Sequence, residues 1–487
     1  MLTRFRALLS IALRYGVVAA LAFRVCGTAS GQQTAPVVPV AGQVLVMSDL
    51  HFDPMADPRL VDALAAAEPG RWSDVLDGSG DRSLGRYGQD SNWMLLRSAL
   101  SQMVETLPHP TFVLISGDFL AHRFRLKFNA AGTDHSDAAY RIFVQRTMQF
   151  LGQQLEQVFP GTPIIPALGN NDEICGDYEL QPSGPFLADT LDILRRLVGG
   201  GRAPDFDRDW QSYGNCSARV GGVRVLSTNT NFFSIHYRNA CGTSVGGDAG
   251  GDPGRATLAW LEAQLAAARE AGERVWLLYH IPPGIDGYAT LRQGACPGNV
   301  IPMWDQAYAG DFSALLRRYA DVIRVSFAGH THMDDFRLVG NAERRFGFAL
   351  ISPAVSPIFG QNPAFRTVAY DAAGGILDQS TYDLTNLPAA TASAGPSAEW
   401  RLEYTFTQQW SLPRIDLPSL DRLYSLITDV PAEAARWHMI FPVSSPVYWA
   451  PFSDSSEQLA SAVRAFRCAA GNVVPSDYER CYCGDRN

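Results

Sequence analysis

Five short segments of this sequence end in the same three residue types, Asp, Asn and His. Each segment is an apolar run typical of a buried strand, and polar or turn-forming residues follow it at once. The runs are Val44–Met47 before SDLH, Phe112–Ile115 before SGDFLAH, Ile164–Ala167 before LGNND, Val275–Leu278 before YHIPPG, and Val322–Phe327 before AGHTH. Nitrogen and hard oxygen donors without a thiolate are ligands that zinc, iron and manganese all accept.

The number of donors in these segments predicts more than one metal ion. The donor side chains are seven: Asp49, His51, Asp118, Asn170, His280, His330 and His332. One catalytic metal takes three or four protein ligands, so seven suit two ions that share a bridging carboxylate. Two ions roughly 3.5–4 Å apart can hold the attacking and leaving oxygens of a displacement at phosphorus. A water bridging them would be a hydroxide near neutral pH.

The elements that carry these donors indicate an α/β fold. Amphipathic segments alternate with the apolar runs, and Ala256–Ala271 is the clearest helix because Leu258, Leu261 and Leu265 share one face. Ligands in such folds bind beyond the carboxyl ends of strands, where the loops converge. Any one of the five motifs alone is weak evidence for a metal site, since Asp, Asn and His also suit turns. Their joint occurrence favours one metal site over coincidence.

These motifs resemble the calcineurin-like metallophosphoesterase superfamily. HIPPG from His280, GHTHMDDF from Gly329 and WRLEY from Trp400 are similar to acid sphingomyelinase-like phosphodiesterases, over about residues 44–487. The resemblance implies a four-layer αββα sandwich, two β-sheets flanked by helices, with a helical C-terminal subdomain. It also implies hydrolysis of phosphodiester or phosphoanhydride bonds by attack of a metal-bridging hydroxide.

Carried over from the resemblance, the ligands divide between two divalent ions. One ion would take Asp49, His51, Asp118 and His332, and the other would take Asp118, Asn170, His280 and His330. Zinc is the first expectation for both positions, with iron and manganese as alternatives. Asp118 is then the catalytic bridge between the ions. His122 would position the phosphate or protonate the leaving oxygen.

Two departures from the family bear on the substrate. The family usually has a histidine where this chain has Asn171, whose amide donates a hydrogen bond but is no acid near pH 7. Protonation then falls to His122 or is not needed, and polyphosphate-cleaving relatives share the Gly-Asn-Asn-Asp form. No saposin domain fits between the predicted signal and the first strand, which favours soluble nucleotide, polyphosphate or headgroup phosphoesters. A sphingomyelin phosphodiesterase proper and a catalytically impaired metal- or phosphate-binding homologue stay as alternatives.

Composition and the N-terminus predict an exported protein with a small phosphoester as its partner. A net charge of -9 argues against a nucleic-acid scaffold, because phosphate neutralisation needs a basic face. Residues 1–29 resemble a cleavable signal peptide, and no later apolar run is long enough to span a membrane. We therefore expect a secreted or periplasmic protein without stable membrane insertion once the signal is removed. The sequence does not indicate the oligomeric state.

The cysteines beyond the signal agree with an oxidising compartment. None of them forms a Cys-x-x-Cys pair, so disulfides are expected rather than a zinc ribbon, with three bridges and one thiol as the simplest count. The family resemblance suggests Cys241 with Cys296, Cys175 with Cys216, and Cys468 with either Cys481 or Cys483.

A change in composition divides the chain into two parts. Leu387–Ser397 has the small and Pro-containing composition of a linker. We therefore predict a metallophosphoesterase catalytic domain over residues 40–386. A helical C-terminal subdomain is predicted over residues 398–487, with helical patterning in Leu417–Ile427 and Ser456–Cys468.

Overall fold

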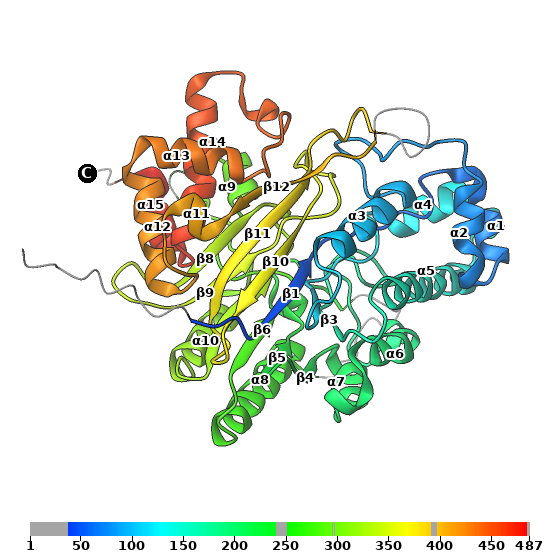
Figure 1. The fold of residues 1–487 in the computed structure, drawn as a ribbon, viewed down its shortest axis with the longest axis horizontal. Coiled ribbons are helices and arrows are strands. Elements are labelled where there is room, and N and C mark those ends of the chain that lie inside the picture. The colour runs from blue at the N-terminus through cyan, green and yellow to red at the C-terminus, as the bar shows by residue number, and fades with distance from the viewer. Residues whose placement is uncertain (1–37, 240–250, 295, 297, 391–396, 485–487) are drawn as a thin grey trace, which may run out of the picture. The chain divides into compact units, whose positions relative to one another are not determined.

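The fold is built on two mixed β-sheets with helices packed around them (Figure 1). The computed structural model describes residues 38–239, 251–294, 296, 298–390 and 397–484. The predicted signal peptide, 1–29, lies outside these residues. None of the described helices combines the length and the apolar character needed to cross a membrane.

The first sheet contains three of the five predicted strands side by side. Among the described residues its order is β12 (Trp400–Thr405), β11 (Ile376–Leu384), β10 (Ala364–Tyr370), β1 (Gly42–Met47), β2 (Val113–Ile115) and β3 (Ile164–Pro166). β1, β2 and β3 are parallel, whereas β10, β11 and β12 pair antiparallel. The carboxyl ends of β1, β2 and β3 therefore meet at one edge of the sheet.

The second sheet contains the other two predicted strands. Its order among the described residues is β4 (Cys216–Val220), β5 (Val223–Ser227), β6 (Val275–Leu278), β7 (Ile323–Ala328), β9 (Arg345–Ile351) and β8 (Asp335–Gly340). The central strands β5, β6, β7 and β9 run parallel, and β4 and β8 are antiparallel edges. All five predicted strands are thus confirmed, but they are divided between two sheets.

The alternation of side chains along β6 shows how the sheets pack. Trp276 and Leu278 point into the core shared with the first sheet, and the Trp276 ring lies 5.5 Å from Phe112 and 5.0 Å from Tyr370. Val275 and Leu277 point the other way, into a second core. Successive side chains of a strand face opposite sides, so a strand that is apolar throughout must be covered on both.

Helices supply the outer layers. The predicted helix around Leu258, Leu261 and Leu265 is confirmed as α8 (Pro253–Glu270), and with α10 (Gln306–Arg318) it covers the outer face of the second sheet. Apolar side chains of α3 (Trp93–Thr106) and α5 (Asp137–Val158) belong to the same core as the first sheet. The remaining helices before the C-terminal segment are α1 (Val61–Ala66), α2 (Trp72–Asp77), α4 (Phe124–Ala131), α6 (Pro185–Val198), α7 (Phe206–Tyr213) and α9 (Gly287–Arg292). Short 3-10 helices are η1 (Pro58–Leu60), η2 (Pro69–Arg71), η3 (Gly200–Arg202), η4 (Thr230–Phe233) and η5 (Ala450–Phe452).

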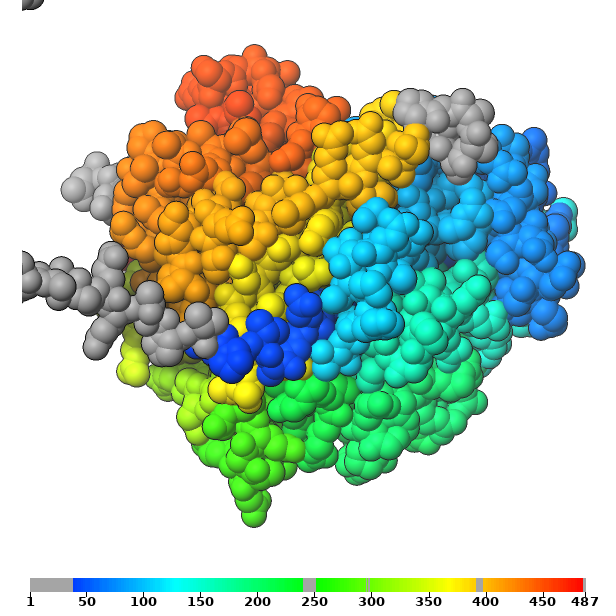
Figure 2. Space-filling model, viewed as in Figure 1, coloured from blue at the N-terminus to red at the C-terminus, as the bar shows by residue number. Residues whose placement is uncertain are grey.

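The C-terminal segment begins with a strand and is mostly helical after it. It contains α11 (Phe406–Trp410), α12 (Leu417–Asp429), α13 (Pro431–Ile440), α14 (Ser456–Gly471) and α15 (Pro475–Cys483). Figure 2 shows these helices, coloured orange to red, massed beside the yellow strands. The segment begins with β12, which pairs with β11 and extends the first sheet. The expected domain limits stay predictions, and part of the expected linker, 391–396, lies outside the described residues.

The disulfide pattern corrects two of the three pairings that the resemblance suggested. Cys296 bonds to Cys483, so it is not the partner of Cys241, which lies outside the described residues. Cys216 is a buried free thiol, so Cys175, which is disulfide-bonded, does not pair with it. The third expectation, Cys468 with Cys481 or Cys483, is confirmed, and the partner is Cys481. Cys216 lies on β4 inside the core, where the sequence offered no sign of its burial.

Candidate functional site

The loops after the predicted strands adopt unusual backbone conformations. Five predicted site residues have positive φ angles, namely Asp49 (49°), His51 (39°), Asp118 (56°), His330 (73°) and His332 (66°). Residues other than glycine are strained at positive φ, so they keep this conformation only where the surrounding structure holds it. Such residues cluster at functional sites, and here they all carry donor groups.

Two motif glycines permit these loops to approach one another. A Cβ atom at Gly169 would collide with the Oδ1 atom and the backbone nitrogen of Asp118. A Cβ atom at Gly329 would collide with Ser48 Oγ and would lie 2.7 Å from Asp49 Oδ2. The sequences Gly-Asn and Gly-His-Thr-His therefore need glycine because backbone and carboxylate meet without room for a side chain.

Asp118 lies between a histidine of each sheet. Its Oδ2 atom is 3.3 Å from Nε2 of His51, which follows β1, and 3.2 Å from Nε2 of His280, which follows β6. The side chains of all three residues are buried. This is the geometry expected of a carboxylate shared between two metal positions.

Asp49 completes one side of the site. Its Oδ1 atom lies 3.3 Å from His332 Nε2 and 3.9 Å from His51 Nε2. Both carboxylate oxygens of Asp49 accept a hydrogen bond from the backbone N–H of His330, each at 3.2 Å. Asp49 therefore contacts both histidines of the Gly-His-Thr-His loop as well as His51.

Asn170 completes the other side. Its Oδ1 atom lies 3.0 Å from His280 Nε2 and 2.9 Å from His330 Nδ1. The amide nitrogen of Asn170 donates to Asp177 Oδ1 at 2.6 Å, which fixes the amide so that its oxygen faces the histidines. An amide oxygen is a hard donor of the kind expected beside two imidazoles.

Backbone carbonyls orient two of the histidines. His51 Nδ1 lies 2.9 Å from the carbonyl of Leu120, and His280 Nδ1 lies 2.7 Å from the carbonyl of Ser116. A histidine that binds a metal usually donates its other ring N–H in this way, which sets the tautomer and the ring orientation. In both residues Nε2 is then the nitrogen presented to the site.

The buried charges of the site favour bound cations. Burial raises the pKa of Asp49 to about 7 and lowers the pKa of His51 to about 4 and of His330 to about 3. Burial also acts to raise the pKa of Asp118, but the charges of His280 and His51 hold it well below its usual range. Burial acts to lower the pKa of His280, but the charges of Asp118 and Asp49 raise it to about 9. Neutral imidazoles and ionised carboxylates are the forms that bind divalent ions.

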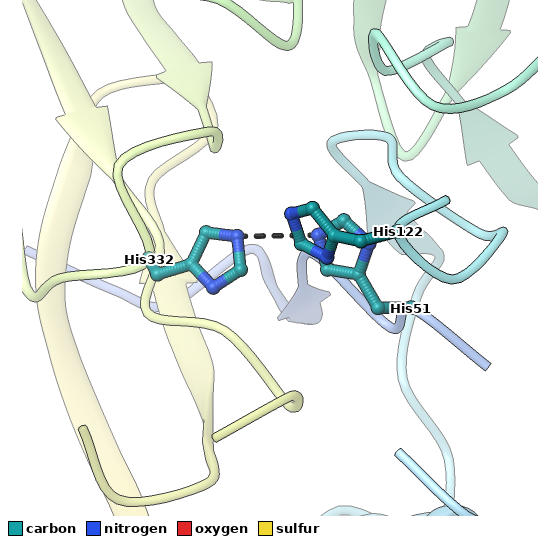
Figure 3. A group of neighbouring side chains, drawn as sticks. All are labelled: His51, His122 and His332. Atoms are coloured by element: carbon teal, nitrogen blue, oxygen red, sulfur yellow. Dashed lines mark hydrogen bonds between the residues drawn. The ribbon is translucent and has the colours of Figure 1, made fainter. Parts of the chain in front are cut away.

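Two groups of side chains in the described part of the chain could each hold an ion. One group is Asp49, Asp118 and His280, and the other is His51, His122 and His332, with the donor atoms of each group within 4.8 Å of one another. Figure 3 shows His332 facing His51 across a 3.2 Å contact between their Nε2 atoms, with His122 beside His51. The donors are nitrogen and oxygen, and no thiolate is among them. The set therefore fits a pair of divalent ions.

The structure places Asn171 against Asp118. The backbone N–H of Asn171 donates to Asp118 Oδ1 at 2.9 Å, and the side-chain amide donates to Asp118 Oδ2 at 3.1 Å. Asn171 is therefore within reach of the predicted reaction site, and it orients the carboxylate of Asp118. Its role in the reaction stays a prediction.

The second predicted substrate-side residue, His122, stacks on His51. Their ring centroids are 4.0 Å apart, and His122 Nδ1 lies 2.8 Å from Asp90 Oδ1. Burial acts to lower the pKa of His122, but the hydrogen bond and the charge of Asp90 outweigh it and raise that pKa above its ordinary value. His122 is the most exposed of the three clustered histidines, with a side chain 25% exposed.

Sequence reasoning missed several residues that build this site. Asp172 accepts hydrogen bonds from the backbone N–H groups of Asp118, Phe119, Leu120 and Gly169 at 2.7–3.1 Å, and so joins two of the loops. The motif LGNND contains Asp172, but nothing in its spacing shows this function. Asp90 and Lys127 were missed because they lie in distant segments without a motif. Lys127 did carry one signal, since it is the only lysine of the chain.

A large cavity adjoins the site. Its volume is about 1240 Å³, and His330 and Tyr178 line it together with residues of the C-terminal segment. Aromatic side chains of the lining include Tyr87, Tyr288, Phe359, Tyr448, Phe452 and Phe466. The cavity is therefore a chamber lined by both aromatic and charged side chains, and it opens beside the candidate metal ligand His330.

Comparison with known proteins finds phosphodiesterases among the similar sequences. No family model matches the chain. Human acid sphingomyelinase-like phosphodiesterase 3b is 27% identical over 439 residues, which cover 83% of each chain. Mouse cyclic GMP-AMP phosphodiesterase SMPDL3A is 25% identical over 478 residues, covering 94% of this chain and 95% of the relative. Among solved structures, a dimetal phosphatase from Danio rerio is more distant, with a TM-score of 0.40, 13% identity and coverage of 74% of this chain and 99% of that one.

The chain is a homologue of phosphodiesterases with a candidate dimetal site. Over most of its length it is similar to acid sphingomyelinase-like phosphodiesterases.

Replacing the shared carboxylate tests the site directly. We expect Asp118→Asn to lower the metal content at both positions, because the amide loses the charge that two ions would share. Metal content is measured by mass spectrometry after dialysis. The matched control Asp189→Asn, which removes a partner of Arg141 away from the site, should keep the wild-type content. Full metal content in Asp118→Asn would contradict the bridging role.

Proposed function

We propose that this protein is a secreted, metal-dependent phosphodiesterase that hydrolyses diesters carrying an organic substituent. The observation that supports it most is the position of Asp118 Oδ2, 3.3 Å from His51 Nε2 and 3.2 Å from His280 Nε2. One ion would be held by Asp49, His51, Asp118 and His332. The other would be held by Asp118, Asn170, His280 and His330.

Such a pair of ions supplies Lewis acidity toward phosphoryl oxygens and lowers the pKa of bound water. The residues of the chain perform the remaining tasks. Asn171 keeps the Asp118 carboxylate turned toward both positions through its two hydrogen bonds. His122, stacked on His51 and partly exposed, contacts the phosphate or the leaving oxygen. Zinc is the proposed metal, with iron and manganese as alternatives, since imidazole, carboxylate and amide donors suit all three.

The cavity supports an organic diester over inorganic polyphosphate. Polyphosphate carries a negative charge on each phosphate and needs a basic channel. The cavity lining instead contains the carboxyl groups of Asp286, Asp335 and Glu457. Of its two arginines, Arg337 is paired with Asp335, and the Arg292 guanidinium lies over the Tyr288 ring. Aromatic rings around them suit the organic part of a substrate. The human and mouse relatives are named as phosphodiesterases, which agrees with this preference.

Disulfides support the extracytoplasmic part of the proposal. Cys296–Cys483 and Cys468–Cys481 join the C-terminal helices to the rest of the chain and to each other. Structural disulfides form and persist in oxidising compartments. A secreted or periplasmic location is therefore proposed, with a small phosphoester as the partner.

A substrate panel on metal-analysed protein tests the function. Bis-p-nitrophenyl phosphate, nucleoside triphosphates, sphingomyelin and polyphosphate are offered to the protein before and after chelation. We expect turnover of organic phosphodiesters, its loss with chelator, and its return with zinc or manganese. Fastest turnover of polyphosphate would contradict the argument from the cavity, and fastest turnover of sphingomyelin would favour the sphingomyelinase alternative. Two bound metals without any turnover would make the protein a binding homologue.

Asn171 gives a prediction about the leaving group. If the site lacks a strong acid at this position, rates should fall steeply as the pKa of the leaving group rises. Asn171→His adds a titratable group and should flatten that dependence across a series of aryl phosphodiesters. Asn171→Ala is the matched control, because it removes the hydrogen bond to Asp118 without adding an acid, and should keep the steep slope. Equal slopes in wild type and Asn171→His would contradict the idea.

A further inference from the structure

The one lysine of this chain is placed between two buried carboxylates. Lys127 lies on α4, and its Nζ atom donates to Asp53 Oδ2 at 2.7 Å and to Asp90 Oδ2 at 2.5 Å. The Asp90 side chain is 1% exposed, the Asp53 side chain 11% and the lysine side chain 31%. A carboxylate buried as deeply as Asp90 is costly unless it is paired and hydrogen-bonded, and Lys127 supplies the opposite charge.

Asp90 in turn holds His122 at two points. Asp90 Oδ1 lies 2.8 Å from the ring nitrogen Nδ1, and Asp90 Oδ2 accepts the backbone N–H of His122 at 3.1 Å. A carboxylate facing Nδ1 selects the tautomer in which Nδ1 carries a proton and leaves Nε2 for the site. The ring is also restrained from its face by stacking on His51.

The network connects separate parts of the chain to the site. Asp53 comes two residues after His51, and Asp90 lies in the loop before α3. Lys127 lies in the first turn of α4, which begins two residues after His122. His51 and His280 are oriented by the backbone carbonyls of Leu120 and Ser116, which both lie in the segment that follows β2. His122 is oriented instead by a side chain that itself needs a cation. The orientation of His122 therefore depends on two further side chains.

We propose that Asp90 and Lys127 are positioning residues, which fix the tautomer and the orientation of the His122 ring so that Nε2 faces the phosphodiester. Asp53 anchors Lys127 to the loop that carries His51. This inference rests on the proposed function, in which His122 contacts the phosphate or the leaving oxygen. Neither Asp90 nor Lys127 touches the substrate, so each acts through His122.

A double-mutant cycle tests that dependence. Asp90→Ala and Lys127→Met should each lower kcat for bis-p-nitrophenyl phosphate by about 10- to 100-fold, with KM and metal content close to wild type. Lys127→Arg keeps the charge and should stay closer to wild type than Lys127→Met. In a His122→Ala background, adding Asp90→Ala should lower kcat by less than about 2-fold, because the residue through which Asp90 acts is gone. Asp189→Ala is the control for loss of an unrelated carboxylate.

If the losses of kcat from Asp90→Ala and His122→Ala multiply in the double variant, the proposal is overturned, since Asp90 then acts on something other than His122. A loss of bound metal in Asp90→Ala would overturn it as well. These outcomes differ from a failure of the proposed function, in which wild type itself turns over no diester.

A spectroscopic measurement tests the network without activity. In ¹⁵N-histidine NMR of the whole protein, His122 should show a proton on Nδ1, and that signature should be lost or averaged in Asp90→Ala and Lys127→Met. Asp189→Ala should leave it unchanged. A proton on Nε2 alone in wild type, or an unchanged signature in both variants, would overturn the proposal even in a protein without turnover.

Discussion

The carboxylate of Asp118, held between a histidine of each sheet, is the interaction on which the rest of the structure depends. Asp118 follows β2 of the first sheet, and its Oδ2 atom lies near His51 of the same sheet and His280 of the other. Bringing these groups together requires loops with positive φ angles and a glycine at position 169. It also requires Asp172, whose oxygens accept four backbone N–H groups from the two loops. These loops store backbone strain, which costs folding free energy, because the site must hold many donor groups in one buried place.

Much of the fold and the site could be predicted because the signal is local. An apolar run followed at once by Asp, Asn or His predicts a strand and the donor at its end, and the carboxyl ends of such strands converge. Asp90 and Lys127 could not be predicted, because they reach His122 from segments distant in the chain. The pairings Cys241–Cys296 and Cys175–Cys216 failed for a related reason. Sequence spacing does not show that Cys216 lies inside the core, or that the C-terminal helix brings Cys483 to Cys296.

The C-terminal segment connects the site to the cavity. β12 extends the first sheet, while Tyr448, Phe452 and Phe466 of the same segment line the chamber beside His330. Tyr404 of β12 donates to Asp334, which comes two residues after His332. The two disulfides of this segment restrain α14 and α15. The segment therefore supports the Gly-His-Thr-His loop and shapes the space in which an organic group would lie.

The most direct test of the central claim is anomalous diffraction from crystals of the protein grown with zinc. We expect two anomalous peaks about 3.5–4 Å apart, one on each side of the Asp118 carboxylate. One peak would fall near His51 and His332, and the other near His280 and His330. A single peak, or two peaks out of reach of Asp118, would contradict a site in which this carboxylate is shared by two ions.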